Sequence, residues 1–168
     1  MGLKLSLSPT SDGEFSGIEL LQYIYAILYC KSYRKKYNDQ LKYDFPSIPY
    51  PTSAKQFRAL AQVGKKLFDI HLPDLYYRNP ESPVVLSELR TYKFINDTVV
   101  LNGSLVIQAF TGVKERLLGG YAPADKWLKD RKGKAITESD IATYKRIIQT
   151  LAETDMLMEE IESIISFE

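Results

Sequence analysis

The stretch Gly119-Gly120-Tyr121-Ala122-Pro123-Ala124-Asp125-Lys126-Trp127-Leu128-Lys129-Asp130-Arg131-Lys132-Gly133 separates a β-type segment from a long helical pattern. Its double glycine predicts a flexible turn at the end of the β-type segment. Pro123 suits the first turn of a short helix, and Gly133 is a natural left-handed terminator for that helix. Trp127, the only tryptophan, and Leu128 are predicted to pack inward, while the neighbouring lysines and arginines stay in solvent.

Upstream of this stretch, residues 84–118 form the predicted β part of the chain. Runs rich in β-branched and aromatic residues predict short strands at 84–86, 92–95, 99–101 and 105–107. Asn96-Asp97 and Asn102-Gly103-Ser104 are turn signals between these runs, and the second is typical of a hairpin. A last strand is expected within 113–118. The segment is therefore predicted to form a small, mostly antiparallel sheet.

Residues 1–79 form the predicted helical N-terminal part. Ser16 and Glu19 have the spacing of a capping box, and apolar residues at helical spacing follow them. Helix is expected to continue through a basic, tyrosine-rich stretch at 33–42. Three prolines within 44–51 then stop helix formation. The isoleucine and an aromatic residue among these prolines predict a strap that is pinned onto the core.

A further helix is predicted after this strap. Thr52 or Ser53 can cap it, an apolar stripe begins at Phe57, and the helix is expected to end near His71. His71 is the only histidine, and no cysteine or carboxylate lies at ligand or triad spacing around it. It is predicted to be structural rather than catalytic or metal-binding.

Residues 121–167 form the predicted C-terminal helical part. Residues 137–140 resemble a helix cap, and one long amphipathic helix is expected after them, to about Phe167. Its apolar stripe consists of Ile141, Tyr144, Ile148, Leu151, Met158, Ile161 and Ile165. A stripe this long requires a partner, either the first helices or another domain, and an uncovered stripe would favour self-association.

These parts predict one α+β domain over residues 1–168, with a helical N-terminal part, a small mostly antiparallel central sheet and a long C-terminal amphipathic helix. A chain of 168 residues is of single-domain size. The longest apolar run, residues 23–30, is too short to span a bilayer, so no membrane partner is predicted. No signal segment opens the chain and it has one cysteine, Cys30, which is expected to be buried and inert. A cytoplasmic location is therefore expected.

The charges are segregated along the chain, although the net charge is only +1. Residues 31–66 carry nine basic and two acidic groups, and residues 126–134 carry five basic groups and one acidic group. Residues 138–168 carry eight acidic and two basic groups. This asymmetry fits a nucleic-acid face with an opposite, repelling face. The charge pattern by itself favours the simpler interpretation, that these are solvated helix surfaces.

No motif in the sequence predicts catalysis. It contains neither a glycine-rich dinucleotide or phosphate loop, nor a Cys/His zinc cluster, nor a nucleophile elbow. Asn79-Pro80 is followed by Glu81-Ser82, not by the proline and aromatic residue with which amino-methyltransferases hold a flipped base. No catalytic residue, metal site or cofactor is therefore predicted, and a self-sufficient methyltransferase is the least favoured of the functions considered.

Several strings nevertheless resemble one family. Four stretches of the chain resemble, in the same order, stretches of type ISP-like restriction-modification enzymes. They are Tyr23-Ile24-Tyr25-Ala26-Ile27-Leu28-Tyr29, Tyr33-Arg34-Lys35-Lys36-Tyr37, residues 44–49 and, with the greatest similarity, Gly119–Gly133. The similarity covers about residues 18–162 and falls in the C-terminal specificity, or target-recognition, region of those enzymes. Ser47 stands where that family commonly has arginine, so no phosphate contact is carried over to it.

This resemblance implies a DNA-recognition and coupling fragment of an adenine-specific DNA methyltransferase or restriction enzyme, non-catalytic by itself. The implied partners are double-stranded DNA and the catalytic methyltransferase and helicase domains of the parent polypeptide. The predicted phosphate contacts are Arg34, Lys35, Lys36, Lys126, Lys129, Arg131 and Lys132. The predicted base-edge contacts, on or near β turns, are Arg90 and Lys93. The alternative is a helical protein-interaction module that makes no DNA contact.

Overall fold

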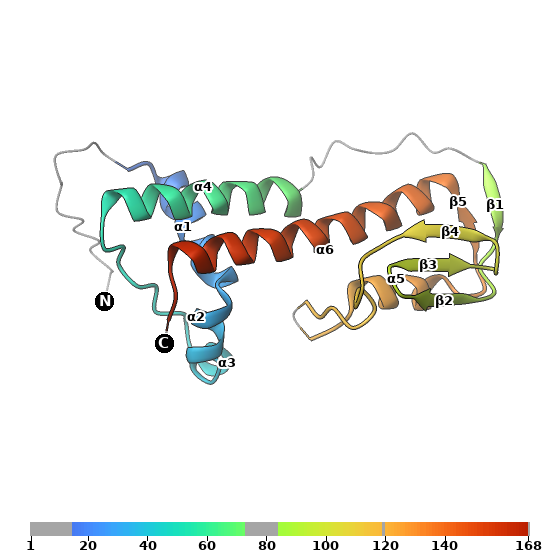
Figure 1. The fold of residues 1–168 in the computed structure, drawn as a ribbon, viewed down its shortest axis with the longest axis horizontal. Helices are drawn as coiled ribbons and strands as arrows, with labels where there is room; N and C mark the ends of the chain where they lie inside the picture. The colour runs from blue at the N-terminus through green and yellow to red at the C-terminus, as the bar shows by residue number, and fades with distance from the viewer. Residues whose placement is uncertain (1–14, 73–83, 119, 168) are drawn as a thin grey trace. The chain divides into compact units, whose positions relative to one another are not determined.

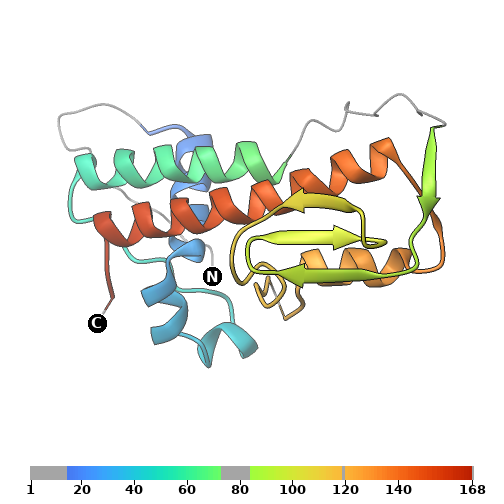
Figure 2. The ribbon, with the colours of Figure 1, turned by 45° about the vertical axis from the view of Figure 1, so that its right-hand side comes forward.

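The computed structural model describes residues 15–72, 84–118 and 120–167, and it divides into two compact units (Figures 1 and 2). Residues 1–71 and 156–168 belong to unit 1, and residues 72–155 belong to unit 2. The long helix α6, Glu138–Ile164, contributes its first part to unit 2 and its last part to unit 1. The described elements confirm the α+β class, with helices, small antiparallel sheets and a long C-terminal helix.

Unit 1 is helical, and its first helix begins at the predicted cap. Helix α1, Gly17–Tyr29, carries a complete capping box, because Glu19 N donates to Ser16 Oγ at 3.2 Å and Ser16 N donates to Glu19 Oε2 at 2.8 Å. Helix α4, Ala54–His71, is capped by the residue before it, Ser53, whose hydroxyl accepts a hydrogen bond from Gln56 N at 3.1 Å. Both caps satisfy backbone donors that the first helical turn leaves free.

The single helix expected over residues 33–42 is replaced by two short ones. Cys30 takes an extended conformation, with φ −65° and ψ 123°, and separates α1 from α2, Lys31–Lys36. Helix α3 covers Gln40–Tyr43. The backbone N–H of Ser32 donates to the Glu162 carboxylate of α6 at 2.8 Å. The cap that allows a new helix to start here is thus supplied by a residue 130 positions away.

The proline-rich strap at 44–51 is confirmed, but its aromatic residues do not pin it. Ile48 packs against the core of unit 1, and the strap carbonyls of Ser47 and Pro49 accept hydrogen bonds from the hydroxyls of Tyr33 and Tyr23, at 3.0 and 2.8 Å. Phe45 and Tyr50 are exposed instead. Buried tyrosine hydroxyls need partners, and here irregular backbone provides them.

Helices α1 and α4 cross closely because a glycine lies at their contact. A Cβ atom on Gly64 would overlap the backbone carbonyl of Gln22. Phe57 and Leu60 of α4 are buried beside Tyr23 and Ile27 of α1. The end of α6 completes this core through Ile161.

The described residues of unit 2 form two antiparallel sheets, where the sequence predicted one. The larger sheet pairs three strands in chain order: β2 (Tyr92–Ile95), β3 (Thr98–Leu101) and β4 (Leu105–Gln108). Strand β1, Val85–Glu88, pairs instead with β5, Ala135–Thr137, which was not predicted. Both turn predictions within the larger sheet are confirmed, because Asn96 and the pair Asn102 and Gly103 have positive φ angles.

The prediction of a strand within 113–118 is wrong. Residues 111–115 form turns, and Gly112 has a φ of 87°, which an extended strand does not allow. Val113 is buried in the core of unit 2 as a single anchor of this turn segment. Leu118 forms one isolated bridge with Tyr121.

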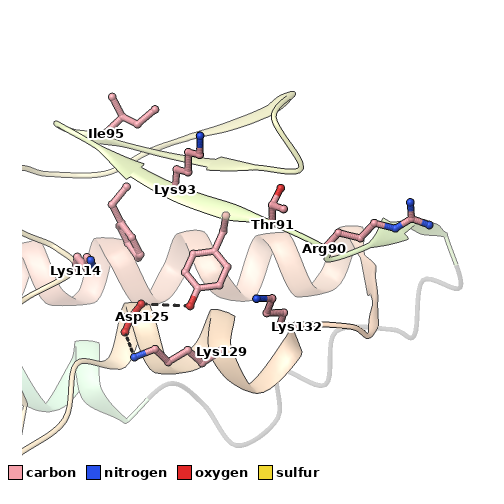
Figure 3. A pocket seen from close by; sticks show the side chains of 10 residues that line it. Arg90, Thr91, Lys93, Ile95, Lys114, Asp125, Lys129 and Lys132 are labelled. Atoms are coloured by element: carbon pink, nitrogen blue, oxygen red, sulfur yellow. Dashed lines mark hydrogen bonds and ion pairs between the residues drawn. The ribbon is translucent and has the colours of Figure 1, made fainter.

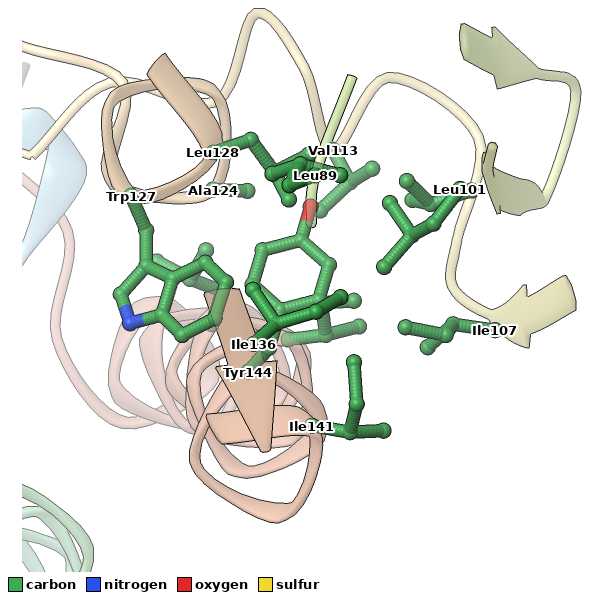
Figure 4. Close-up of a cluster of buried hydrophobic side chains, with 13 residues drawn as sticks. Leu89, Leu101, Ile107, Val113, Ala124, Trp127, Leu128, Ile136, Ile141 and Tyr144 are labelled. Carbon is green, nitrogen blue, oxygen red and sulfur yellow. The ribbon is translucent and has the colours of Figure 1, made fainter. Parts of the chain in front are cut away.

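The core of unit 2 lies between the larger sheet, α5 and the first part of α6 (Figure 4). Helix α5, Pro123–Arg131, has proline in its first turn and ends before Gly133, whose φ is 79°, as predicted. Trp127 and Leu128 are buried, and the Trp127 ring packs on Tyr144 of α6 with centroids 4.9 Å apart.

Helix α6 begins at the predicted cap, where Asp140 N donates to Thr137 Oγ1 at 3.1 Å. Its apolar stripe is covered within the chain: Ile141, Tyr144, Ile148 and Leu151 belong to the core of unit 2, and Ile161 belongs to that of unit 1. Self-association was predicted only for an uncovered stripe, and these five residues of the stripe are covered.

Candidate nucleic-acid interface

Basic side chains from three separate segments line one open hollow of about 660 Å3 in unit 2 (Figure 3). The segments are β2 with the residues before it, α5 with the residue after it, and the turn segment that holds Lys114. The basic residues are Arg90, Lys93, Lys114, Lys129 and Lys132. Among the described residues that line the hollow, Asp125 is the one acid. We call this hollow the basic groove.

A backbone contact brings the end of α5 to the start of β2. Gly133 N donates to the carbonyl of Leu89 at 2.8 Å, and Leu89 N donates to the carbonyl of Lys134 at 2.9 Å. This pair of bonds extends the β1–β5 ladder beyond its last strand residues. Lys132 and Arg90, the neighbours of Gly133 and Leu89, therefore lie at the same end of the groove.

The Asn102 side chain fixes the backbone that carries Arg90. Its Oδ1 atom accepts from Arg90 N at 2.9 Å and from Thr91 N at 3.2 Å. Its Nδ2 atom donates to Glu88 O at 2.8 Å and to Ser87 Oγ at 3.0 Å. One amide thus uses both of its ends to attach the β1–β2 connection to the β3–β4 turn.

Asp125 holds Lys129 at the floor of the groove. Its carboxylate is nearly buried and lies 2.6 Å from Lys129 Nζ, one helical turn away. The hydrogen bond from Lys129 to Asp125, with the attraction between their charges, raises the pKa of Lys129. The Tyr92 hydroxyl approaches the same carboxylate at 3.5 Å, and burial followed by the Asp125 charge raises the pKa of Tyr92. The ion pair thus favours the charged form of Lys129, whose side chain is 66% exposed.

Lys93 lines the groove from the outer face of the sheet. Tyr92 and Phe94 pack against the core, and side chains alternate along a strand. Figure 3 accordingly shows Lys93 and Ile95 projecting away from α5, on the far side of β2. The groove thus follows β2, the edge strand of its sheet, and it continues onto the solvent face.

Lys114 was not predicted as a site residue. The sequence placed it in a strand, whereas the turn around Gly112 leaves it exposed at the groove. The glycine after Thr111 is the one local signal for this turn, and nothing in the sequence indicates that the turn lies near β2.

Five of the predicted site residues lie outside the groove. Lys126 pairs with Asp130 at 2.8 Å across one helical turn. The Arg131 guanidinium lies 3.8 Å from the centroid of the Trp127 ring, and its Nε donates to Asp140 at 3.2 Å. The remaining three, Arg34, Lys35 and Lys36, are exposed on α2 in unit 1.

The described residues do not indicate a metal site. In residues 15–72, 84–118 and 120–167, no group of three or more His, Cys, Asp or Glu side chains is arranged to hold a metal ion. Burial lowers the pKa of His71, and its Nδ1 atom is hydrogen-bonded to the Tyr25 hydroxyl at 2.9 Å, as a structural histidine requires. In the same parts of the chain, no helix is long and apolar enough to cross a membrane.

An α+β module with a basic groove at a sheet edge is of the kind that recognises nucleic acid, and family comparison gives its class. Residues 4–160 match the model of the Type ISP C-terminal specificity domain. The chain belongs to this family, as the resemblance predicted. No curated protein matches the sequence.

Two solved structures have the same fold. One is a nuclease-deletion mutant of the Type ISP restriction-modification enzyme LlaGI in complex with a DNA substrate mimic, with a TM-score of 0.61, 20% identity and 92% of this chain covered. The other is a DrdV–DNA complex, with a TM-score of 0.54, 21% identity and 89% covered. The chain spans only 14% and 18% of those two proteins.

Proposed function

We propose that this chain is the DNA target-recognition module of a restriction-modification enzyme and that it contacts duplex DNA through the basic groove. The observation that carries the proposal is the convergence of Arg90, Lys93, Lys114, Lys129 and Lys132 from three segments. Cations contribute to DNA affinity by displacing counterions from phosphates, so a shared groove acts as one electrostatic footprint. Membership of the specificity-domain family supports this assignment.

Within the groove, the proposed roles follow from geometry. Lys129 and Lys132, on and just after α5, suit phosphate contacts, since the first is held in place by Asp125. Arg90 has a mostly exposed side chain on an anchored backbone, so it can present its guanidinium to a base edge or a phosphate. Lys93 remains proposed as a base-edge contact because it projects from the outer face of the sheet.

The cations outside the groove are proposed as secondary phosphate contacts. Lys126 and Arg131 lie outside the groove, and each has an acidic partner with which a phosphate would compete, as Lys129 also does. Arg34, Lys35 and Lys36 are exposed on α2 and remain proposed contacts from unit 1. The two units are proposed to act as one recognition module over residues 1–168.

The catalytic methyltransferase and helicase domains are the proposed protein partners. The chain corresponds to a small part of each DNA-bound neighbour, so catalysis is assigned to other domains. In unit 1, the side chains of Phe45 and Tyr50 are 93% and 65% exposed beside an apolar hollow that Ile24 and Phe57 help to line. We propose this surface as the contact with those domains, because exposed aromatic residues typically mark protein interfaces.

A salt series on duplex DNA tests the proposed function. The variant Arg90→Gln/Lys132→Gln removes two charges from the groove, and Lys145→Gln/Arg146→Gln removes two exposed charges from α6 in the same unit. If each groove residue contacts one phosphate, the slope of log K against log salt should decrease by about 1.8 in the first variant. The second variant should keep the wild-type slope.

Fluorescence anisotropy with a labelled duplex gives these slopes directly. Equal slopes for the two variants would contradict the assignment of the groove. Absence of binding by the wild-type chain at low ionic strength would favour the alternative, a protein-interaction module without DNA contact.

A further inference from the structure

The solvent face of the β2–β3–β4 sheet carries an apolar stripe that the core of unit 2 does not explain. The register places Lys93, Val100 and Val106 in one cross-strand row, and Ile95, Thr98 and Gln108 in the next. Ile95 and Val106 are 49% and 58% exposed. With the half-buried Val100 between them, Ile95 and Val106 form a diagonal stripe across three strands.

The opposite face of the same sheet is already filled. Val99, Leu101 and Ile107 are buried, and Tyr92, Phe94 and Leu105 pack against them. Strand alternation therefore places the stripe on the face opposite the described core residues of unit 2. Single exposed apolar residues are common on proteins, but two exposed ones that are joined by the half-buried Val100 on a face beside a basic groove point to a ligand.

The stripe is continuous with the basic groove. Lys93 and Ile95 belong to the outer rows of the sheet and also line the groove. A duplex whose phosphates lie along Arg90, Lys129 and Lys132 would thus bring its bases next to β2.

The charge at the end of the stripe favours contact with bases over contact with phosphates. The Asp97 carboxylate, at the β2–β3 turn, repels phosphate, and the hydrogen bonds that Gln108 Nε2 donates to its Oδ2 atom at 3.0 Å and to its carbonyl at 3.1 Å do not remove its charge. The stripe itself has no charged group to attract phosphate. It can contact apolar atoms only, and the thymine C5-methyl is the apolar group that the four bases present in the major groove.

We propose, on the basis of the proposed DNA-binding function, that Ile95 and Val106 contact thymine methyl groups in the major groove and that they determine sequence specificity. Lys93, in the same row as Val106, contacts the adjacent base edge or phosphate. The groove cations supply affinity for any duplex, and the stripe supplies preference for thymine at one or two positions of the site.

Thymine replacement tests this assignment. The preferred site is first selected from a random duplex library with the wild-type chain, and each thymine in it is then replaced by deoxyuridine, which removes only the methyl group. Replacement at the contacted positions should weaken wild-type binding about fourfold for each buried methyl. Other replacements should have no effect.

The variants Ile95→Thr and Val106→Thr keep a β-branched side chain suited to a strand. Each should weaken the discrimination between thymine and uracil at one position, because threonine keeps one methyl group and replaces the other apolar branch by a hydroxyl, while the salt slope stays unchanged. Val85→Thr is the matched control, since Val85 is also 58% exposed on a strand of unit 2. It should behave as wild type, and Trp127 fluorescence verifies that all three variants are folded.

The outcomes separate this inference from the proposed function. Salt-dependent binding with a preferred site at which deoxyuridine has no effect overturns the thymine contacts and leaves the proposed function standing. Salt-dependent binding without a preferred site overturns both the thymine contacts and target recognition, and leaves only non-specific duplex binding through the basic groove. Loss of discrimination in the Val85→Thr control overturns the assignment to Ile95 and Val106. Absence of any duplex binding overturns both proposals.

Discussion

Replacement of Asn102 should destabilise unit 2 and weaken DNA binding together, because this residue combines a special backbone conformation with four side-chain hydrogen bonds. It has a φ of 51°, and its amide contacts Arg90, Thr91, Ser87 and Glu88. Each of these bonds lies at the surface, so we assign each about 0.5 kcal/mol, the low end for a protein hydrogen bond.

A short series of variants separates the two effects. Asn102→Gly keeps the backbone conformation and loses all four bonds, so the free energy of unfolding should fall by about 2 kcal/mol. Asn102→Ala loses the same bonds and adds a left-handed alanine, so it should fall by about 3 kcal/mol. Asn102→Asp retains an acceptor for the N–H groups of Arg90 and Thr91 but loses the amide donor to both Glu88 O and Ser87 Oγ, and a loss of about 1 kcal/mol is expected from these two bonds.

Urea unfolding followed by tryptophan fluorescence measures these differences. Trp127 is the only tryptophan and lies in the core of unit 2, so its signal reports on the unit that contains Asn102. Wild-type stability of Asn102→Gly would refute the importance of the side-chain bonds. Equal stability of the glycine and alanine variants would refute the contribution of the backbone conformation.

The same variant tests whether Asn102 positions Arg90 for DNA. If it does, Arg90→Gln should weaken binding in the wild-type background and have little further effect in Asn102→Gly. Additive losses would mean that the guanidinium reaches DNA without an anchored backbone. Because binding is measured under native conditions, where both variants are folded, lost stability does not imitate this result.

Two further predictions concern unit 1. Burial lowers the pKa of His71, so just below the ordinary histidine pKa of about 6.5 the unfolded chain binds more protons than the folded chain. The free energy of unfolding should therefore fall as the pH drops through that value, and level off below the pKa of the folded state. Unfolding followed by circular dichroism should show that His71→Gln removes this pH dependence. Phe45→Ser/Tyr50→Ser should leave stability within about 0.5 kcal/mol, because both side chains are exposed. Calorimetry should show weaker binding of this variant to the separately produced methyltransferase and helicase domains, and unchanged binding would contradict the proposed contact surface.

The sequence predicted those parts of the fold whose causes lie within a few residues. The capping box at Ser16, the turn at Asn102 and the terminator at Gly133 each act through their own backbone, so residue type and spacing are sufficient. Strand β5 and the break before α2 were missed for the opposite reason. The first depends on pairing with β1, about fifty residues earlier, and the second on a carboxylate 130 residues later.

The candidate site shows the same division. Four of its five basic residues were predicted from charge and local context, and Lys114 was missed because its turn was taken for a strand. That these segments meet in one groove was not predictable. Two of the segments, the end of α5 and the residues before β2, are joined by a backbone hydrogen bond between Gly133 and Leu89. Backbone hydrogen bonds have no signature of their own in the sequence.

Local charge counts also overstate what α5 can offer to a polyanion. Asp130 engages Lys126, Asp125 engages Lys129, and Asp140 engages Arg131, so three of the cations in this basic block already have an acidic partner. An exposed ion pair contributes little to stability, but it lowers the net charge that a phosphate meets. The α5 segment thus contributes Lys132 and the paired Lys129 to the groove, and the other cations, Arg90, Lys93 and Lys114, come from other segments, with Arg90 Nε 3.9 Å from Glu88 Oε2. Recognition on this surface is a property of the folded unit 2 and not of the basic helix by itself.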